Sequence, residues 1–319
     1  MITRVKTVDI ANFLKKYGIL LILIALMLLF TALSDVFLTS RNLLNISRQI
    51  SMIGIASVGG MFVMLLGGID LSKGALVSFV NIVCSYFIVN TGMDFVMAIF
   101  ICLVISAMVG YINGILVTAV NIPPLIATLG SQTILYGFAY IISRGQSIAG
   151  FPDAFRVIGQ GHIWEIPVPV IVLVLFLALG YFILNKTYLG RSFYAIGGNA
   201  EAAKLSGINV NRVKRLVYMM SGLFTGFAAI VMLSRVNSGH PNTGLGFEFD
   251  VITAIVLGGI SVSGGSGRLF NAVVGVFIIG VVNNGLVLIG MTHYVQMVVK
   301  GVILITAVGI DCMQKRVKV

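Results

Sequence analysis

Residues 95–117 read FVMAIFICLVISAMVGYINGILV, a run of 23 residues without a charged side chain. An α-helix rises 1.5 Å per residue, so a run of this length crosses the roughly 30 Å hydrocarbon core of a bilayer. The whole chain has the same character: of its 319 residues 58% are hydrophobic and only 10% are charged, and its mean hydropathy is +1.07. Soluble domains carry about 25% charged residues. The sequence therefore predicts a polytopic membrane protein.

Ten apolar runs predict an all-α fold of about ten transmembrane helices. Polar segments, often containing Gly or Pro, separate the runs and are typical of loops. The first run follows several basic residues, as a signal peptide does, but its length favours an uncleaved first span. We expect crossings at residues 18–33, 46–66, 71–89, 95–117, 125–142, 167–184, 216–233, 249–263, 269–289 and 294–312.

The distribution of Lys and Arg predicts which side of the membrane each loop occupies. With both termini in the cytoplasm, 15 of the 21 basic residues fall on the inner side, five on the outer side, and one, Lys300, inside a span. Cytoplasmic loops are enriched in these residues, so both termini and segment 185–215 are expected inside. The net charge of +11 has the same explanation, because no basic stripe with interleaved aromatic residues indicates a nucleic-acid partner.

One short polar helix is predicted inside that cytoplasmic segment, in the stretch GGNAEAAKLSGI (residues 197–208). Asn199 is a good N-cap, Glu201 and Lys204 have the order that the helix dipole favours, and Gly207 suits the position after the helix. About two turns of helix are too short to be stable alone in water. We therefore expect this helix to rest against the membrane surface, the bundle or another protein.

Two glycine-containing turns resemble each other along the chain. LLGGIDLSKG (residues 65–74) is echoed by VLGGISVSGG (residues 256–265), and both are expected near the cytoplasmic side. Paired glycines at the end of a span permit a positive φ and close backbone approach. The echo indicates either a broken helix near a solute path or a chance similarity in a glycine-rich chain.

No motif in the chain predicts an enzyme or a cofactor site. The stretch GGSGR (residues 264–268) lacks the lysine and spacing of a phosphate-binding loop, and no nucleophile–base arrangement is present. The three His and three Cys residues have no metal-ligand spacing, so no metal is expected. If the protein moves a solute uphill, the energy must come from an ion gradient or from a partner.

Few ionisable residues are available for ion coupling. Carriers driven by ion gradients bury such residues within their spans. Those near or inside the predicted spans are Asp70, Glu248, Asp250, Lys300 and Asp311. This is a small set, which argues against a secondary carrier.

Uncharged polar residues are more numerous in the spans and suit a path for a neutral, hydroxyl-rich solute. From their predicted depth we select Gln132, Tyr136, Asn283 and Asn284 as residues that line it. Residues of this kind more often hydrogen-bond between helices than contact a ligand. The small-residue pairs Gly110/Gly114 and Gly222/Gly226 indicate close helix packing instead.

Four motifs carry a resemblance to a known family. They are GGIDLSKG (67–74), GRSFYAIGGNAEAAKLSGINVNRVKR (190–215), FEFDVITAIVLGGISVSGGSGR (247–268) and NNGLVLIG (283–290). In this order they resemble the permease subunits of ribose-type bacterial sugar ABC importers. The resemblance implies a multi-pass inner-membrane permease that translocates a monosaccharide and is not itself an enzyme.

The resemblance also implies partners. Such permeases pair with a second permease copy or a paralogue, bind cytoplasmic ABC ATPase subunits, and receive solute from a periplasmic binding protein. ATP and Mg²⁺ belong to the ATPase, so this chain is expected to bind no cofactor. We expect residues 1–319 to form one permease domain with segment 185–215 as a coupling loop within it.

Within that loop the resemblance assigns the coupling helix to residues 199–207. Asn199 and Gly207 would delimit it, while the small side chains of Ala202 and Ala203 would allow close approach to a groove of the ATPase. Glu201 and Lys204 would contact the rim of that groove. Lys73 departs from the family pattern, and we expect it either to anchor a span at the lipid headgroups or to face the solute path.

The solute is left open by the sequence. Ribose-like pentoses, polyols, signalling sugars and branched-chain amino acids are all carried by related permeases. An ion-coupled secondary carrier remains a less favoured alternative.

Overall fold

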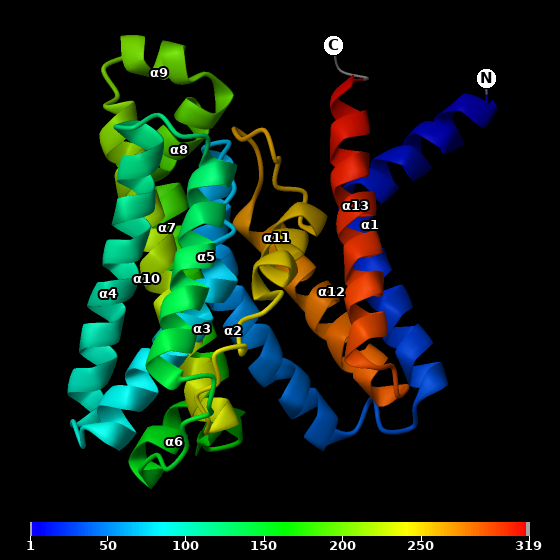
Figure 1. The fold of residues 1–319 in the computed structure, drawn as a ribbon. Helices are drawn as coiled ribbons and strands as arrows, with labels where there is room; N and C mark the ends of the chain where they lie inside the picture. The colour runs from blue at the N-terminus through cyan, green and yellow to red at the C-terminus, as the bar shows by residue number, and fades with distance from the viewer. Residues whose placement is uncertain (1, 317–319) are drawn as a thin grey trace.

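The computed structural model describes the backbone of residues 2–316 and the side chains of residues 17–313. It is a bundle of helices with one two-stranded hairpin (Figure 1). The elements are α1 (Ile2–Leu33), α2 (Ser40–Leu65), α3 (Lys73–Ser85) continued by a π-helical turn (Tyr86–Asn90), α4 (Phe95–Thr118), α5 (Pro124–Ser143), α6 (Asp153–Gln160), β1 (His162–Ile163), β2 (Ile166–Pro167), α7 (Val168–Lys186), α8 (Tyr188–Gly198), α9 (Ala200–Leu205), α10 (Val210–Val236), α11 (Phe247–Leu257), α12 (Leu269–Leu288) and α13 (His293–Arg316).

Eight of these helices are long and apolar enough to cross a membrane, counted over the described residues. They are α2, α3 with its π-helical turn, α4, α5, α7, α10, α12 and α13, and each coincides with a predicted crossing. The predicted first crossing lies in α1, whose apolar part is the shorter stretch Tyr17–Leu33. The all-α membrane fold is therefore confirmed, with fewer full-length spans than the ten expected.

The predicted eighth crossing is the clearest departure. Segment 249–263 was expected to span the membrane, but α11 has only 11 residues and is about 16 Å long, half the thickness of the hydrocarbon core. The loop from Asn237 to Gly246 comes first and packs against α3, so α11 begins inside the protein. Segment 249–263 is apolar, but the helix within it is shorter than the apolar segment.

The basic residues at the two ends cannot be placed. The predicted orientation counts Arg4, Lys6, Lys15, Lys16, Lys315, Arg316 and Lys318 on the inner side, and their side chains lie outside the described residues.

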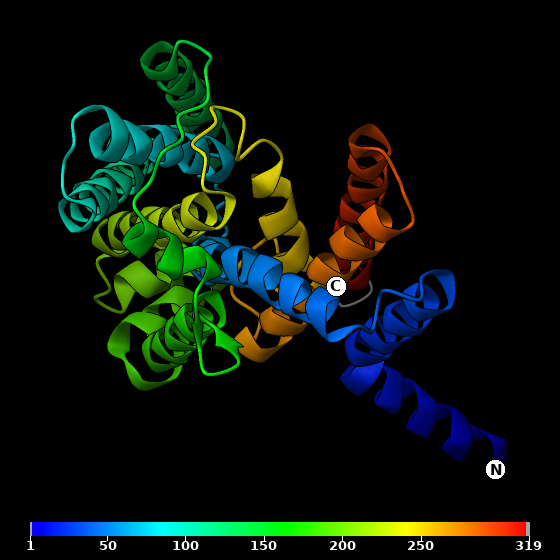
Figure 2. The same cartoon turned by 90° about the horizontal axis from the view of Figure 1, so that it is seen from below.

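Helices α2, α3, α10 and α12 form the centre of the bundle. The buried share of the membrane-spanning window is 89% in α2, 72% in α3 and 67% in each of α10 and α12, against 22% in each of α4, α5 and α7. Helix α13 is the most exposed span, with 6% buried, and it lies with α1 to one side of the bundle (Figure 2). The peripheral helices therefore present apolar faces that suit lipid or another membrane helix.

Glycine packing joins α4 to α10, as the sequence predicted. Gly110 and Gly222 face each other so closely that a Cβ on either would overlap the other helix's backbone. Gly226 packs against Ser106 in the same way, and Gly114 packs against the backbone of α10. Small residues let the two backbones approach, which maximises dispersion contact where no hydrophobic effect operates between helices.

Candidate functional site

Helix α9 has the capping pattern predicted for it. The Asn199 side chain accepts a hydrogen bond from the Ala202 amide at 3.0 Å, and Gly207 adopts the left-handed conformation with φ of 84°. Glu201 lies in the first turn and Lys204 in the last, where each charge complements the helix dipole. In Figure 1 the helix lies at the end of the bundle where α13 ends, and α6 lies at the opposite end.

The two alanines of α9 point in different directions. Ala203 is 4% exposed and packs into the protein's own core, whereas Ala202 is exposed. Ala203 therefore joins α9 to the bundle and does not form part of its outer face, contrary to the role expected from the resemblance. The outer face consists of Glu201, Ala202, Lys204 and Leu205, and Leu205 is 89% exposed.

Sequence reasoning missed Leu205, because a single leucine in a short helix is normally assigned to the inner face. A groove of about 530 Å³ runs beside this outer face between α9 and the start of α10. Glu201, Lys204 and Lys214 supply its charged lining. The outer face of α9 therefore combines one exposed apolar side chain with a charged groove.

The end of α8 connects this surface to the membrane helices. A Cβ at Gly197 would overlap the Leu65 carbonyl oxygen and the Gly265 amide nitrogen, so α8 contacts both echoed turns. The turns also contact each other, since the Gly265 amide donates to the Leu65 carbonyl at 2.9 Å. The Tyr194 hydroxyl donates to the Gly267 carbonyl at 3.0 Å, and burial raises the pKa of that hydroxyl. The echoed turns thus form one junction against α8, within segment 185–215.

Lys73 is buried, which excludes the headgroup anchor considered from the sequence. It is 1% exposed, its Nζ lies 3.3 Å from Asp70 Oδ2, and it donates to Ser221 and Thr225. Asp70 also accepts hydrogen bonds from Ser72 and, at 2.9 Å, from the Ser221 hydroxyl. This network fixes the start of α3 against α10, and Lys73 does not belong among the cytoplasmic lysines.

A polar face of α3 supports the loop that precedes α11. Gly74 lies so close to Glu248 and the Gly244 carbonyl that a Cβ would overlap both, and the Ser78 hydroxyl accepts from the Gly244 amide at 2.9 Å. About two turns further along α3, Ser85 packs against Gly239. The small residues on this face of α3 admit the loop into the bundle.

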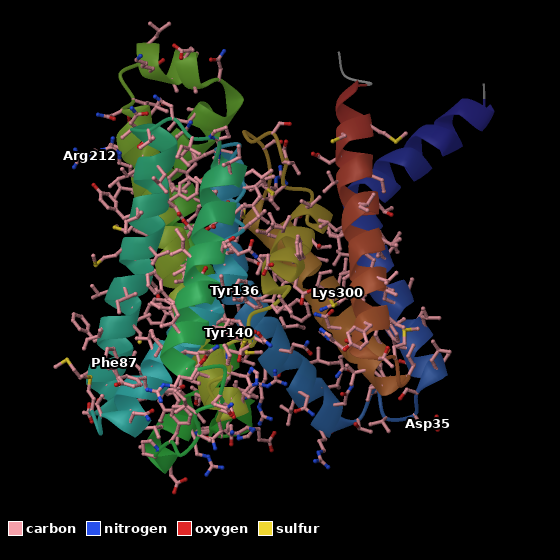
Figure 3. The ribbon with its side chains drawn as sticks, viewed as in Figure 1. Asp35, Phe87, Tyr136, Tyr140, Arg212 and Lys300 are labelled. Carbon is pink, nitrogen blue, oxygen red and sulfur yellow. The ribbon has the colours of Figure 1, made fainter. Side chains whose placement is uncertain are left out.

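A polar stripe on α5 faces the same segment from the other side. Thr128, Gln132, Tyr136 and Tyr140 follow one another at intervals of four residues and therefore share a face. Gln132 donates to Glu248 Oε1 at 2.9 Å, and Tyr140 donates to Asn242. Figure 3 shows Tyr136 and Tyr140 directed from α5 toward the middle of the molecule, with Lys300 across from them on α13. Of the four predicted path residues, Gln132 and Tyr136 thus lie together beside Glu248.

The other two predicted path residues lie elsewhere. Asn283 donates to Asp250 Oδ2 at 3.1 Å, next to the ion pair between Asp250 and Lys300 at 3.0 Å. Asn284 exchanges two hydrogen bonds of 2.9 Å with Asn42 of α2. Sequence depth alone could not distinguish these interhelical bonds from a common site.

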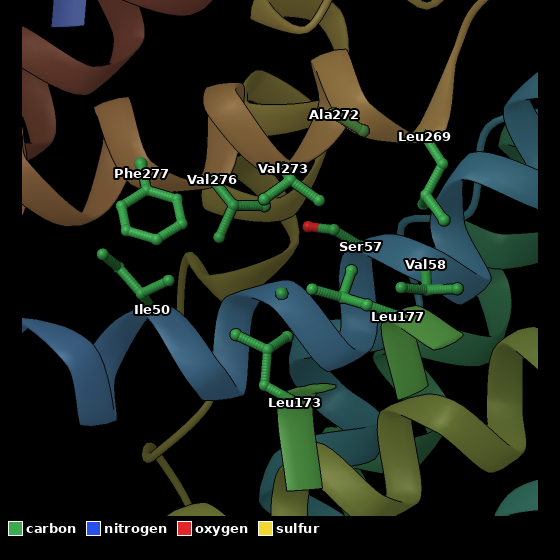
Figure 4. Close-up of a pocket in the computed structure, with 11 residues that line it drawn as sticks. Ile50, Ser57, Val58, Leu173, Leu177, Leu269, Ala272, Val273, Val276 and Phe277 are labelled. Carbon is green, nitrogen blue, oxygen red and sulfur yellow. The ribbon is translucent and has the colours of Figure 1, made fainter. Parts of the chain in front are cut away.

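A crevice between α2, α7 and α12 is unsuited to a polar solute (Figure 4). Its volume is about 10 Å³, room for about one water molecule. Aliphatic and aromatic side chains form nearly all of its wall, and Ser57 is the polar residue there. The polar segment between α3 and α5 is therefore the better candidate for contact with solute.

The comparisons with known proteins agree with one another. Residues 42–308 match the family model of the branched-chain amino acid transport system permease component. The ribose import permease protein RbsC of Bacillus subtilis is 40% identical over 311 residues, covering 97% of this chain and 96% of that protein. The Escherichia coli D-allose permease AlsC is 36% identical, covering 96% of this chain and 94% of its own length, and the L-arabinose permease AraH is 33% identical, covering 95% and 92%. No solved structure matches the chain.

Proposed function

The chain belongs to the family of branched-chain amino acid transport system permease components, the membrane subunits of ABC importers, and we propose from its sugar-permease relatives that it translocates a ribose-like monosaccharide. It is a multi-pass transport subunit and not an enzyme. The identity of 33–40% to permeases named for ribose, allose and arabinose supports a sugar as its solute.

One structural observation suits a sugar. Glu248 is a buried carboxylate, and no Lys or Arg of the described residues pairs with it. A solute with a net negative charge would place a second negative charge beside it, which a site of low dielectric disfavours. A sugar is neutral and offers hydroxyl donors to the same oxygens.

We place the ABC ATPase on the outer face of α9. The exposed Leu205 and Ala202 would enter an apolar groove of the ATPase, while Glu201 and Lys204 contact its rim, and Asn199 and Gly207 hold the two ends of the helix. ATP and Mg²⁺ would be bound by that subunit, and no cofactor by this chain. A periplasmic binding protein would contact the opposite end, at α6 and the β1–β2 hairpin, and a second permease copy or a paralogue would pack within the membrane.

The contacts described above give this arrangement a mechanical route. Movement of α9 would pass through Gly197 to the turns at Leu65 and Gly265. Those turns end α2 and connect α11 to α12, so they lead to the helices that bear Lys73 and Glu248. Nucleotide-driven closure of the ATPase would thereby change the positions of α3 and α11 relative to α5.

The proposed orientation puts α9 and both termini in the cytoplasm. Segment 185–215 carries six basic residues, which favours its retention inside. We treat residues 1–319 as one permease domain, with segment 185–215 as the coupling loop within it.

Uptake measurements test the solute. Cells that lack their own ribose permease are supplied with this chain together with its ATPase and binding protein. We expect them to accumulate radiolabelled ribose and not leucine, and to lose uptake when the ATPase cannot hydrolyse ATP. Uptake driven by an ion gradient in liposomes containing this chain alone would contradict the proposal.

Two substitutions test the coupling role. Ala202→Trp adds bulk to the outer face of α9, and Gly207→Pro cannot adopt a φ of 84° because proline fixes φ near −65°. We expect both chains to reach the membrane and both to fail in uptake. Normal uptake in either variant would count against α9 as the coupling helix.

A further inference from the structure

Three acidic residues lie buried in the membrane-embedded part of the described chain, and two of them have a cation. Asp70 pairs with Lys73 at 3.3 Å, and Asp250 pairs with Lys300 at 3.0 Å. Glu248, which is 2% exposed, has no Lys or Arg within ion-pair distance among the described residues. Burying an unpaired carboxylate is costly, so its retention indicates a use.

The two oxygens of Glu248 differ in their surroundings. Oε1 accepts from the Gln132 amide at 2.9 Å, whereas Oε2 is buried against Gly74 and has no hydrogen-bond partner. Glu248 lies in the first turn of α11, where the helix dipole favours a negative charge. The helix start and the unpartnered oxygen are independent observations, and both indicate a site for hydrogen-bond donors.

A second unpartnered group lies beside it. The Tyr136 hydroxyl is buried without a hydrogen bond of normal geometry, next to Glu248 and Ser78. Tyr136 is one helical turn from Gln132 on the polar stripe of α5, so both side chains face α11. Buried polar groups in folded proteins are almost always paired, and two unpaired groups side by side call for a common partner.

We propose that Glu248, Gln132 and Tyr136 form a hydroxyl-binding subsite for the solute, which in this conformation is closed by the bond between Gln132 and Glu248. The proposal rests on the proposed function, because it takes the solute to be a sugar. One sugar hydroxyl donates to Glu248 and replaces the Gln132 amide, and a neighbouring hydroxyl accepts from Tyr136 or Gln132. Gln132 and Glu248 thus close the path when it is empty, and they hold the sugar when α5 moves away from α11.

The chemistry of the three groups defines the solute class. A carboxylate accepts hydrogen bonds only, while an amide and a phenol both donate and accept. Together they match a neutral molecule with adjacent hydroxyl groups. A solute with a net negative charge is disfavoured, because it would place a second negative charge beside Glu248.

Deoxy sugars test this assignment. The initial rate of ATP-dependent uptake is measured for ribose and for each of its monodeoxy analogues, in the native chain and in Glu248→Gln and Tyr136→Phe. In the native chain we expect at least one analogue to be taken up about tenfold less efficiently, because a hydrogen bond to a charged group is lost. In Glu248→Gln that preference should fall to about twofold or less. Thr133→Ala, an exposed substitution next to Gln132 on the other face of α5, is the control and should keep the native preference.

A labelling measurement keeps the proposal testable if Glu248→Gln does not accumulate in the membrane. In a Cys312→Ser background, which removes the exposed cysteine, Tyr136→Cys is treated with a thiol reagent during ATP turnover. Ribose should slow the modification severalfold, and leucine should not.

The outcomes separate the two proposals. Two results overturn the subsite alone, provided that the native chain takes up ribose. One is an unchanged deoxy-sugar preference in Glu248→Gln, and the other is modification of Tyr136→Cys that ribose does not slow. A native chain that takes up leucine and no sugar overturns the proposed function, and the subsite with it.

Discussion

At the scale of single residues, one of the two buried ion pairs is local to the chain. Lys73 follows Asp70 by three residues, so the pair forms at the start of α3 before any distant contact is needed. Ser221 and Thr225 of α10 then accept the remaining hydrogen bonds of the ammonium group. A buried ion pair adds stability only when its other bonding positions are filled, as they are here.

Removing one member of this pair should destabilise the protein. Lys73→Met leaves Asp70 buried without its cation, and such a loss costs about 3–5 kcal/mol. We expect a clear fall in the midpoint of thermal unfolding of the detergent-solubilised protein.

The double variant Asp70→Asn/Lys73→Met serves as the matched control. It removes both charges together and should recover much of the stability lost in Lys73→Met, because no uncompensated charge stays buried. A double variant no more stable than Lys73→Met would show that the pair is not the source of the effect.

At the scale of elements, α11 is a half-length helix because of what precedes it. Gly246 adopts a φ of 80° directly before the helix, and the loop before it lies against α3 at Gly239 and Gly244. Residues with larger side chains at these positions would force the loop away from α3. The break therefore depends on close backbone packing between two elements far apart in sequence.

Gly74→Ala should disturb this contact. The added Cβ would overlap the Gly244 carbonyl and the Glu248 carboxylate, and overpacking of this kind costs about 1–3 kcal/mol. We expect reduced thermal stability together with reduced sugar uptake. Gly137→Ala is the control, because its Cβ would meet open space on α5; a similar loss in both variants would argue against the specific contact.

The junction below the coupling loop gives a second prediction at this scale. Gly197→Ala places a Cβ into the Leu65 carbonyl and the Gly265 amide, whereas the same change at Gly198 meets nothing within 4 Å. We expect Gly197→Ala to lower the rate of uptake per ATP hydrolysed, measured in reconstituted vesicles. Gly198→Ala should keep the native ratio, and equal ratios in the two variants would remove the junction from the route of coupling.

At the scale of the whole molecule, the two ends of the bundle have different character. Helix α9 presents Leu205 and a charged groove at one end, and α6 and the hairpin with Trp164, 95% exposed, lie at the other (Figure 1). In the proposed orientation, α9 would face the ATPase and α6 with the hairpin would face the binding protein.

Leu205→Asp should abolish retention of the ATPase. Burial of a leucine side chain contributes about 1.5–3 kcal/mol, and a carboxylate in its place is costly to desolvate. We expect the ATPase to copurify with the native chain at least tenfold better than with Leu205→Asp. Trp164→Asp, at the opposite end, should retain the ATPase normally, and an equal loss there would indicate general misfolding.

The proposed orientation can be checked in intact cells. In a Cys312→Ser background, Trp164→Cys should react with a thiol reagent that cannot cross the membrane, and Leu205→Cys should react only after the membrane is opened. Labelling of Leu205→Cys in intact cells would place α9 outside and refute both the orientation and the ATPase contact.

Local patterns in the sequence predicted their elements correctly. The eight full-length spans, the capped helix α9 and the glycine packing of α4 on α10 all follow from runs, caps or spacings of a few residues. The half-length of α11 did not follow, because apolarity over residues 249–263 carries no information about a loop that enters the bundle before it.

Apolar length and motif order are properties of the chain alone, and they were enough to predict a membrane bundle and its family. The burial of Lys73, the inward direction of Ala203 and the position of Gln132 and Tyr136 beside Glu248, away from Asn283 and Asn284, became known from the fold. A polar side chain within a membrane is stabilised by hydrogen-bond partners on neighbouring helices. Which partner it finds depends on helices brought together from distant parts of the chain.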